Sequence, residues 1–234
     1  QEVPLKIIEE TAEEKNAPLY VFNKKFGIDS RSVVPGGQLI TVSAIGAPPA
    51  MLFTTMAGIH QSVNLACALQ AVRLVMEHDD AISEETMREG FARATWAGRF
   101  EIKKTLDRTF IFDGAHNAAG AESFGMTYHE LFGETPKTMV MSDKDEMGII
   151  HEVVKPKDTV IAVAAPTPRT EVPEKLVETV RQCVKGVVAQ TEDSVSSALD
   201  LALQSTQDGD IIVVCGSLYI LGEARGWLQN RMSH

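Results

Sequence analysis

The feature that most constrains the fold is a regular alternation of short apolar segments with helical patterns between residues 97 and 234. Five segments have the composition of strands: 110–112, 138–141, 160–164, 187–189 and 210–215. They are apolar throughout and do not alternate with polar residues, which is typical of strands covered on both faces. Strands that alternate with helices predict an α/β fold built on an open, mostly parallel sheet.

Residues 1–96 have a more mixed pattern. Short β patterns at 38–42 and 51–55 flank a Gly/Pro turn and predict a hairpin, and 18–22 also has the composition of a strand. Helical patterns include residues 5–12, residues 65–76 and a segment that begins at Ser83 and ends near Thr95. We therefore expect two domains, 1–96 and 97–234, with a boundary near residues 95–98.

Composition excludes several classes of protein. The net charge is −10 and no basic run occurs, which argues against a nucleic-acid-binding or anionic-membrane surface. No signal peptide and no apolar run of about 20 residues is present in the sequence. The three cysteines are expected to be reduced, buried thiols of a cytoplasmic protein. The chain begins with Gln1 and not with Met, so we expect a processed product or a fragment.

A polar cluster follows the first strand of the second part. Asp113, His116 and Asn117 lie within five residues, at a strand end where parallel α/β sheets bind ligands. Asp113 could hold a ribose hydroxyl or a metal-bound water, and His116 could contact a phosphate or carboxylate oxygen. Alternatively, the aspartate caps the next helix and the histidine is an ordinary exposed residue.

Three more residues are candidates for ligand binding. Arg99, between Gly98 and Phe100, could bind a phosphate through its guanidinium or could be a surface arginine. Ser217 follows Gly216 at a helix start, where it could bind an anion or only cap the helix. Asn64 could read an adenine edge or help to cap the long helix. The usual phosphate-binding motifs, Gly-x-x-x-x-Gly-Lys-Ser/Thr and Gly-x-Gly-x-x-Gly after a strand, are absent from the sequence.

Taken in order, these motifs resemble one family. The chain is similar to the carboxy-terminal portion of folylpolyglutamate synthases and dihydrofolate synthases, within the Mur ligase superfamily. The similarity rests on Ala-Pro-Leu-Tyr-Val at 17–21, His-Gln-x-x-Asn at 60–64, Gly-Arg-Phe-Glu at 98–101, Asp-Gly-Ala-His-Asn at 113–117, Ser-Asp-Lys-Asp at 142–145 and Gly-Ser-Leu-Tyr at 216–219. Two departures are Ala118, where the family usually has proline, and Ser142, where it has lysine.

The resemblance implies an ATP-dependent ligase that adds L-glutamate to a folate-type carboxylate through an acyl phosphate. Residues 97–234 would be the Rossmann-like glutamate-ligase domain, and residues 1–96 the end of the central ATPase domain. Asn64 would contact adenine, Arg99 would bind ATP phosphate, and Asp113 would hold ribose or orient Arg99. His116 and Ser217 would be the catalytic residues beside the incoming glutamate.

The family's P-loop and its Mg²⁺ ligands lie in a half that has no counterpart here. We therefore expect no metal ligand in this chain, and we expect that half of the same enzyme to be its partner. Three interpretations remain: a piece of a folate-type ligase that is inactive alone, a natural truncated protein that binds a nucleotide or glutamate without catalysis, and a Mur-type ligase with a non-folate substrate.

Overall fold

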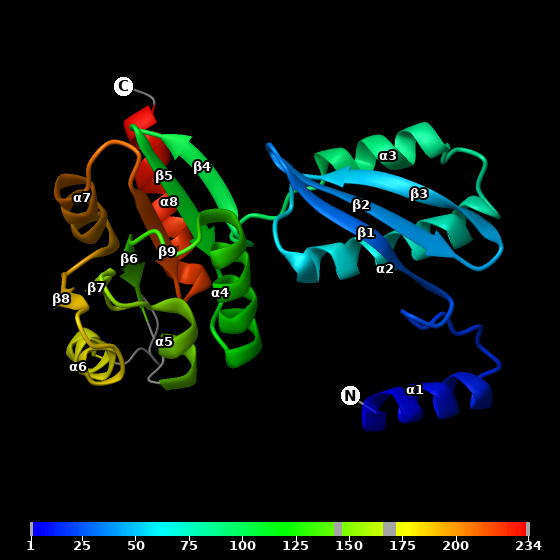
Figure 1. Ribbon diagram of the computed structural model, residues 1–234, viewed down its shortest axis with the longest axis horizontal. Helices are drawn as coiled ribbons and strands as arrows, with labels where there is room; N and C mark the ends of the chain where they lie inside the picture. Colours follow the sequence, from blue (N-terminus) through cyan, green and yellow to red (C-terminus); the bar gives the residue numbers. More distant parts are fainter. Residues whose placement is uncertain (1, 143–146, 166–171, 233–234) are drawn as a thin grey trace. The chain divides into compact units, whose positions relative to one another are not determined.

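The computed structural model describes residues 2–142, 147–165 and 172–232, and these residues form two compact units (Figure 1). One unit comprises Gln1–Thr55 and His60–Ala94, and the other comprises Met56–Ile59 and Thr95–His234. The assignment of these units to a central ATPase domain and a glutamate-ligase domain stays a prediction.

The second unit contains the expected sheet. Its six strands lie in the order β4-β5-β9-β6-β7-β8, and every pairing except β4 with β5 is parallel. The strands are β4 (Glu101–Thr105), β5 (Arg108–Asp113), β6 (Lys137–Met141), β7 (Thr159–Ala162), β8 (Val188–Thr191) and β9 (Ile211–Cys215). The prediction of an α/β fold with a mostly parallel sheet is confirmed.

Helices cover both faces of this sheet (Figure 1). Against one face pack α4 (Ala118–Phe132), α5 (Met147–Val153) and α6 (Pro173–Cys183); against the other pack α7 (Val195–Ser205) and α8 (Leu218–Met232). Side chains of successive strand residues point to opposite faces of the sheet, so Ile111 packs on the α4 side and Phe112 packs on the α8 side. Both faces are therefore apolar, which explains the continuous apolar runs in the sequence.

The sequence prediction missed the edge strand β4. Its residues Glu-Ile-Lys-Lys-Thr are mostly exposed, and it pairs antiparallel with β5 through a tight turn at Leu106 and Asp107. Both turn residues have positive φ, 51° and 54°, the backbone conformation of the two-residue turns that join twisted strands. Because neither is glycine or asparagine, the usual hairpin signal was absent.

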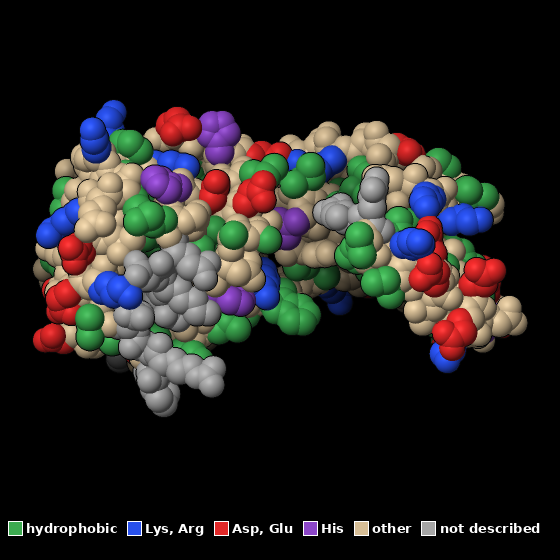
Figure 2. Space-filling view, turned by 90° about the horizontal axis from the view of Figure 1, so that it is seen from below, with side chains coloured by type: hydrophobic (Ala, Val, Ile, Leu, Met, Phe, Trp, Pro, Cys, Tyr) green, Lys and Arg blue, Asp and Glu red, His purple; other side chains and the backbone are tan. Residues whose placement is uncertain are grey.

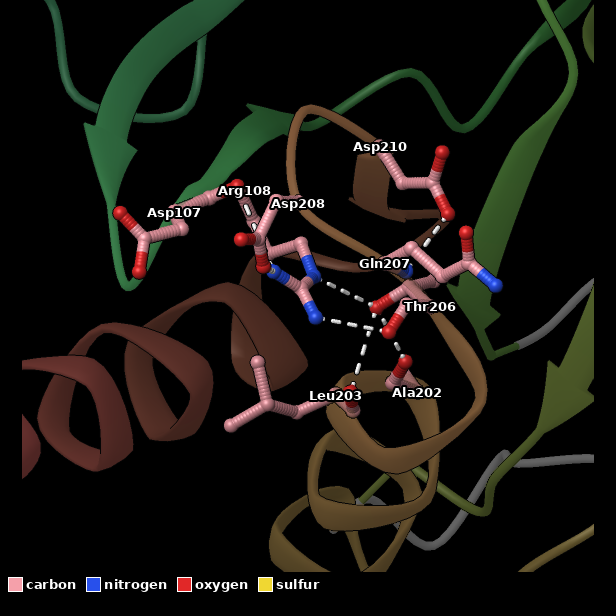
Figure 3. A network of polar contacts seen from close by, with 8 residues as sticks. All are labelled: Asp107, Arg108, Ala202, Leu203, Thr206, Gln207, Asp208 and Asp210. Carbon is pink, nitrogen blue, oxygen red and sulfur yellow. Dashed lines mark hydrogen bonds and ion pairs between the residues drawn. The ribbon is translucent and has the colours of Figure 1, made fainter.

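A polar network ties this turn to the loop between α7 and β9 (Figure 3). Arg108 donates from Nε to Thr206 Oγ1 at 3.0 Å and from Nη2 to the Thr206 carbonyl at 2.7 Å. Its ion pair with Asp208 spans 2.7 Å, but the Asp208 side chain is 86% exposed and the pair contributes little on that account. The bonds to Thr206 therefore dominate, and they fix the amino edge of the sheet.

The first unit is a three-stranded antiparallel sheet with two helices packed against it. Its strands are β1 (Phe26–Val34), β2 (Gly37–Ala44) and β3 (Ala47–Thr54), and its packed helices are α2 (Ile59–Met76) and α3 (Glu84–Arg93). The predicted hairpin is confirmed as β2–β3, and Ser83 caps α3 as expected. A further helix, α1 (Glu2–Glu14), precedes the sheet.

Two expectations for this unit were wrong, and one strand was not predicted. Residues 18–22 form no strand, and only Phe22 makes an isolated bridge, to Phe26. β1 was missed because its Ser, Asp and Arg residues obscure the strand pattern. Cys67 is exposed, not buried, because α2 buries the stripe that contains Leu65 and Leu69.

Replacing Arg108 with alanine tests the role of the network. We expect the free energy of unfolding of the second unit to fall by about 2 kcal/mol, because a largely buried guanidinium loses its bonds and the Thr206 carbonyl loses a donor. Both tryptophans, Trp96 and Trp227, lie in this unit, so tryptophan fluorescence during urea denaturation reports on it. Lys104→Ala, an exposed cation on β4, is the control and should change stability by less than about 0.5 kcal/mol.

Candidate functional site

The candidate site lies where three neighbouring strands end. Asp113 on β5, Cys215 on β9 and Met141 on β6 are paired side by side in the sheet. The chain leaves β5 and β6 toward the face covered by α4 and α5, whereas it leaves β9, between them, toward the face covered by α8. Such a reversal opens a crevice at the carboxyl edge of a parallel sheet, where ligands bind in folds of this class. We call this region the carboxyl-edge site.

Asp113 joins two segments of this site through its carboxylate. The N–H of Phe100 donates to Oδ2 at 2.8 Å, and the N–H of Ala115 donates to Oδ1 at 2.7 Å. Beside them, the N–H of Gly114 donates to the Gly98 carbonyl at 2.8 Å. The turn at residues 98–100 is therefore fixed against the end of β5. Asp113 does not cap the following helix, because its oxygens serve these other amides.

Burial raises the pKa of the Asp113 carboxyl above its usual range, since the side chain is almost fully removed from water. The N–H donors of Phe100 and Ala115 oppose this effect, as does the positive charge of Arg99. The protonated Asp113 carboxyl is therefore the form that favours folding. Its contribution to the free energy of unfolding is complete below the pKa that this carboxyl has in the unfolded chain, and it is lost as pH rises through the pKa that it has in the folded chain. The site holds its ionised carboxylate at a cost, which the two amides and the guanidinium reduce.

Arg99 lies beside Asp113 with its guanidinium directed outward. Its Nη1 is 3.5 Å from the point that a Cβ at Gly114 would occupy, and the residue is exposed. The next side chain, Phe100, points inward: it is 3% exposed and its ring lies 5.4 Å from that of Phe124. Within the described ranges, the guanidinium donates no hydrogen bond to protein. Its N–H donors are therefore not taken up by protein acceptors in these ranges, and an anion could accept them.

Glu101 is a supporting residue to which sequence reasoning assigned no role. Its Oε2 accepts the N–H of Gly98 at 3.0 Å and forms a 2.7 Å ion pair with Arg225 of α8. The signal was present, since Glu101 belongs to the Gly-Arg-Phe-Glu motif. Its contact with Arg225 spans 124 residues of sequence and could not be read from spacing.

His116 and Asn117 follow the strand end and are exposed. His116 Nδ1 lies 2.8 Å from the Gly114 carbonyl, and because a carbonyl only accepts, Nδ1 must carry the proton. In the neutral ring, Nε2 is then left as an acceptor. Asn117 caps α4, since its Oδ1 accepts the N–H of Gly120 at 2.8 Å. The helix cap considered for Asp113 is therefore supplied by Asn117.

Ser217 lies across the crevice at the start of α8. It is 9% exposed, and its hydroxyl accepts the N–H of Tyr219 at 3.3 Å, as a capping serine does. Gly216 before it has φ of 106°, and a Cβ at this position would lie 2.0 Å from the carbonyl oxygen of Ser142. The ends of β9 and β6 thus approach too closely for any residue but glycine. Ser142 is fully buried, whereas residues 143–146, which include Lys144, lie outside the described residues.

Asn64 belongs to the other unit and is not placed relative to this site. It is exposed on α2, and its amide nitrogen donates to Gln61 Oε1 at 3.0 Å. Asn64 lies inside the helix, so it does not act as the N-cap. No group of three or more His, Cys, Asp or Glu residues in the described segments is arranged to hold a metal ion. None of the helices in those segments has the length and apolarity to cross a membrane.

The family is decided by a match over the second unit. Residues 98–218, just over half of the chain, match the glutamate ligase domain of Mur ligases. The chain belongs to the Mur ligase family. The match begins at Gly98 and ends at Leu218, so it includes Arg99, Asp113, His116 and Ser217.

Curated relatives of this Mur ligase chain are folate enzymes. It is 27% identical over 221 residues to the dihydrofolate synthase/folylpolyglutamate synthase of Mycobacterium tuberculosis, covering 87% of the chain and 45% of that protein. It is 31% identical over 173 residues to a probable bifunctional folylpolyglutamate synthase/dihydropteroate synthase of Haloferax volcanii, covering 72% of the chain and 20% of that protein.

Solved structures agree with the sequence relatives. Folylpolyglutamate synthase from Thermotoga maritima has a TM-score of 0.79 and 28% identity, covering 97% of this chain and 52% of that one. FolC from Escherichia coli, in complex with DHPP and ADP, has a TM-score of 0.76 and 25% identity, covering 96% and 51%. The chain therefore spans about half the length of these relatives.

Substituting Gly216 tests the close approach of β9 and β6. Gly216→Ala should lower the free energy of unfolding of the second unit by at least about 2 kcal/mol, because the backbone adopts a strained φ for alanine and the Ser142 carbonyl must move. Urea denaturation followed by tryptophan fluorescence measures the change.

Gly222→Ala in the exposed part of α8 is the matched control. Open space surrounds that glycine, so alanine there should stabilise by about 0.5–1 kcal/mol. Equal effects of the two substitutions would contradict the steric account of Gly216.

Proposed function

We propose that this chain is the carboxy-terminal portion of an ATP-dependent ligase that joins L-glutamate to a folate-type carboxylate. The observation that carries the proposal is the exposed Arg99 guanidinium, held beside the buried Asp113 at the carboxyl edge of the sheet. Membership of the Mur ligase family supports it, as do relatives named dihydrofolate synthase and folylpolyglutamate synthase. ADP in the Escherichia coli FolC structure supports ATP as the cosubstrate.

The reaction has two steps. The folate-type carboxylate attacks the γ-phosphorus of ATP, which gives an acyl phosphate and ADP. The amine of glutamate then attacks the acyl carbon, and the tetrahedral intermediate expels inorganic phosphate to leave an amide. Negative charge accumulates on phosphate oxygens in both steps, so a fixed guanidinium stabilises it. We assign this role to Arg99, whose donors face solvent.

Asp113 has two proposed roles, and its geometry favours one of them. A carboxylate that holds a ribose needs an accessible oxygen, whereas Asp113 is 8% exposed and both of its oxygens accept backbone N–H groups. We therefore assign Asp113 to the orientation of the turn that carries Arg99. Asn64, an exposed amide on α2, is the proposed adenine contact.

His116 and Ser217 are the proposed residues for the incoming glutamate. His116 is exposed, and with Nδ1 donating to the Gly114 carbonyl, an unprotonated Nε2 would accept a hydrogen bond from the ammonium or amine. Ser217 begins α8, whose first N–H groups and hydroxyl favour a carboxylate. The two residues follow β5 and β9, which are adjacent strands.

Mg²⁺ does not fit the described residues as a bound cofactor, since they contain no suitable group of acidic or histidine ligands. We infer that its ligands lie in the part of the enzyme beyond this chain, and we derive no step through it. We also place the enzyme in the cytoplasm, in keeping with three free cysteines.

The proposed partner is the remaining half of the same enzyme. Helix α1 supports this inference because its apolar residues Val3, Ile7 and Ile8 are 72%, 57% and 51% exposed. Apolar residues clustered on an exposed helix mark an interaction surface. Relatives of about twice this length possess a further half that could cover it.

Nucleotide binding to the chain tests the site assignment. Arg99→Ala should weaken ADP binding, measured by calorimetry, by roughly tenfold or more, since a charge-assisted contact contributes about 1.5–3 kcal/mol. Lys185→Ala, an exposed cation remote in sequence from the site, should leave binding unchanged. Equal affinities of Arg99→Ala and the wild-type chain would overturn the assignment.

Adding the first half of the Thermotoga maritima relative in trans tests the reaction. Formation of the amide product should require ATP, glutamate and both polypeptides, and His116→Ala and Ser217→Ala should raise the KM for glutamate. ADP binding without product, even in the joined polypeptide, would favour a non-catalytic binding protein. Product formation only with other acceptors would favour a non-folate substrate.

A further inference from the structure

The first turn of α8 places two leucines against two glycines of the site, Gly98, which precedes Arg99, and Gly114, which follows Asp113. A Cβ at Gly98 would lie 2.7 Å from Leu221 Cδ1, and a Cβ at Gly114 would lie 2.7 Å from Leu218 Cδ2. The leucines are three residues apart and share one face of the helix. Both glycines therefore leave room for α8 to approach the backbone of the site.

The two leucines differ sharply in exposure. Leu221 is 3% exposed and belongs to the core between the sheet and α8. Leu218 is 57% exposed, so burial of its side chain contributes little to stability. Leu218 is therefore an apolar side chain that lies over the site backbone while most of its surface stays in solvent.

Arg99 shares the space above Gly114 with Leu218. The Arg99 Nη1 atom lies 3.5 Å from the same hypothetical Cβ position that Leu218 Cδ2 approaches. Beneath them the backbone is fixed, because the amides of Gly114 and Ala115 donate to the Gly98 carbonyl and to Asp113. The Arg99 guanidinium and the isobutyl group of Leu218 are therefore neighbours above this fixed backbone.

We propose that Leu218 is a positioning residue for Arg99: it limits the guanidinium to the orientations that face the carboxyl-edge site. Leu218 directly follows Ser217. The first turn of α8 would then position both the Arg99 guanidinium, which is proposed to bind phosphate, and the Ser217 hydroxyl, which is proposed to bind the amino acid. The identity of the ligand rests on the proposed function, whereas the restriction of Arg99 by Leu218 is independent of it.

Nuclear magnetic resonance of the ligand-free chain tests the restriction directly. The ¹⁵Nε–H signal of Arg99 is identified by its loss in Arg99→Ala. In Leu218→Ala its order parameter should fall toward that of a free surface arginine, while backbone order parameters of residues 98–100 stay unchanged. Met126→Ala, which removes an apolar side chain of similar exposure from α4, is the control. An unchanged Arg99 signal in Leu218→Ala would overturn the proposal.

Gly114→Ala is a second variant that perturbs the same contact. Its new methyl group would lie 2.7 Å from the flexible end of Leu218, 3.4 Å from the Gly98 carbonyl and 3.5 Å from Arg99 Nη1, so the chain should fold while Leu218 moves away from Gly114. The Arg99 signal should change as in Leu218→Ala. A Gly114→Ala chain with an unaltered Arg99 signal would count equally against the proposal.

A double-mutant cycle distinguishes positioning from a general structural effect. Leu218→Ala should raise the Kd for ADP about three- to tenfold in the wild-type background and leave it unchanged in the Arg99→Ala background. The same loss in both backgrounds would mean that Leu218 acts independently of Arg99. If the wild-type chain binds no ADP, the proposed nucleotide site fails, while the relaxation measurement still decides the role of Leu218.

Discussion

The carboxylate of Asp113 is the interaction on which the rest of the site depends. Asp113 lies at the end of β5 and is almost fully buried. Its carboxylate accepts hydrogen bonds from the backbone N–H groups of Phe100 and Ala115, which belong to two separate segments. Burying a charge is costly unless donors compensate it, and here two amides and a nearby guanidinium reduce the cost without cancelling it. The same bonds that stabilise the carboxylate determine where the Arg99 turn lies.

The two edges of the six-stranded sheet have different tasks. At the amino edge, Arg108 is satisfied by Thr206 and closes the β4–β5 turn onto the loop before β9 (Figure 3). At the carboxyl edge, Arg99 has no such acceptor in the described part of the chain and remains exposed. One arginine therefore stabilises the fold, whereas the other is available to a ligand.

The net charge and the face shown in Figure 2 favour a small anionic ligand over a polyanion. Figure 2 shows acidic and basic side chains interspersed over the face in view, without a continuous basic patch on it. Because the chain has a net charge of −10, its overall electrostatic field repels anions. An anion is attracted only where local hydrogen-bond donors and positive charges overcome that field. The exposed guanidinium and the helix starts at Asn117 and Ser217 supply such donors locally.

Sequence patterns predicted the parallel strands because burial on both faces leaves a continuous apolar signal. They missed β1 and β4, whose exposed polar residues carry no such signal, and they misjudged residues 18–22, where strand-like composition finds no partner strand. For the site, strand-end position drew attention to Asp113, and the flanking Gly98 and Phe100 drew attention to Arg99; both assignments stay predictions. The cap from Asn117, the ion pair of Glu101 with Arg225 and the contact of Leu218 with Gly114 depend on tertiary approach, which spacing does not encode.

The most direct test of this account is a pH titration of the Asp113 carboxyl by ¹³C nuclear magnetic resonance, in the wild-type chain and in Arg99→Ala. The account predicts a pKa above the usual aspartate range in the wild-type chain, because burial dominates, and a further rise in Arg99→Ala, because the neighbouring positive charge is lost. An ordinary pKa that Arg99→Ala leaves unchanged would contradict both the burial of the carboxylate and the electrostatic effect of the guanidinium on it.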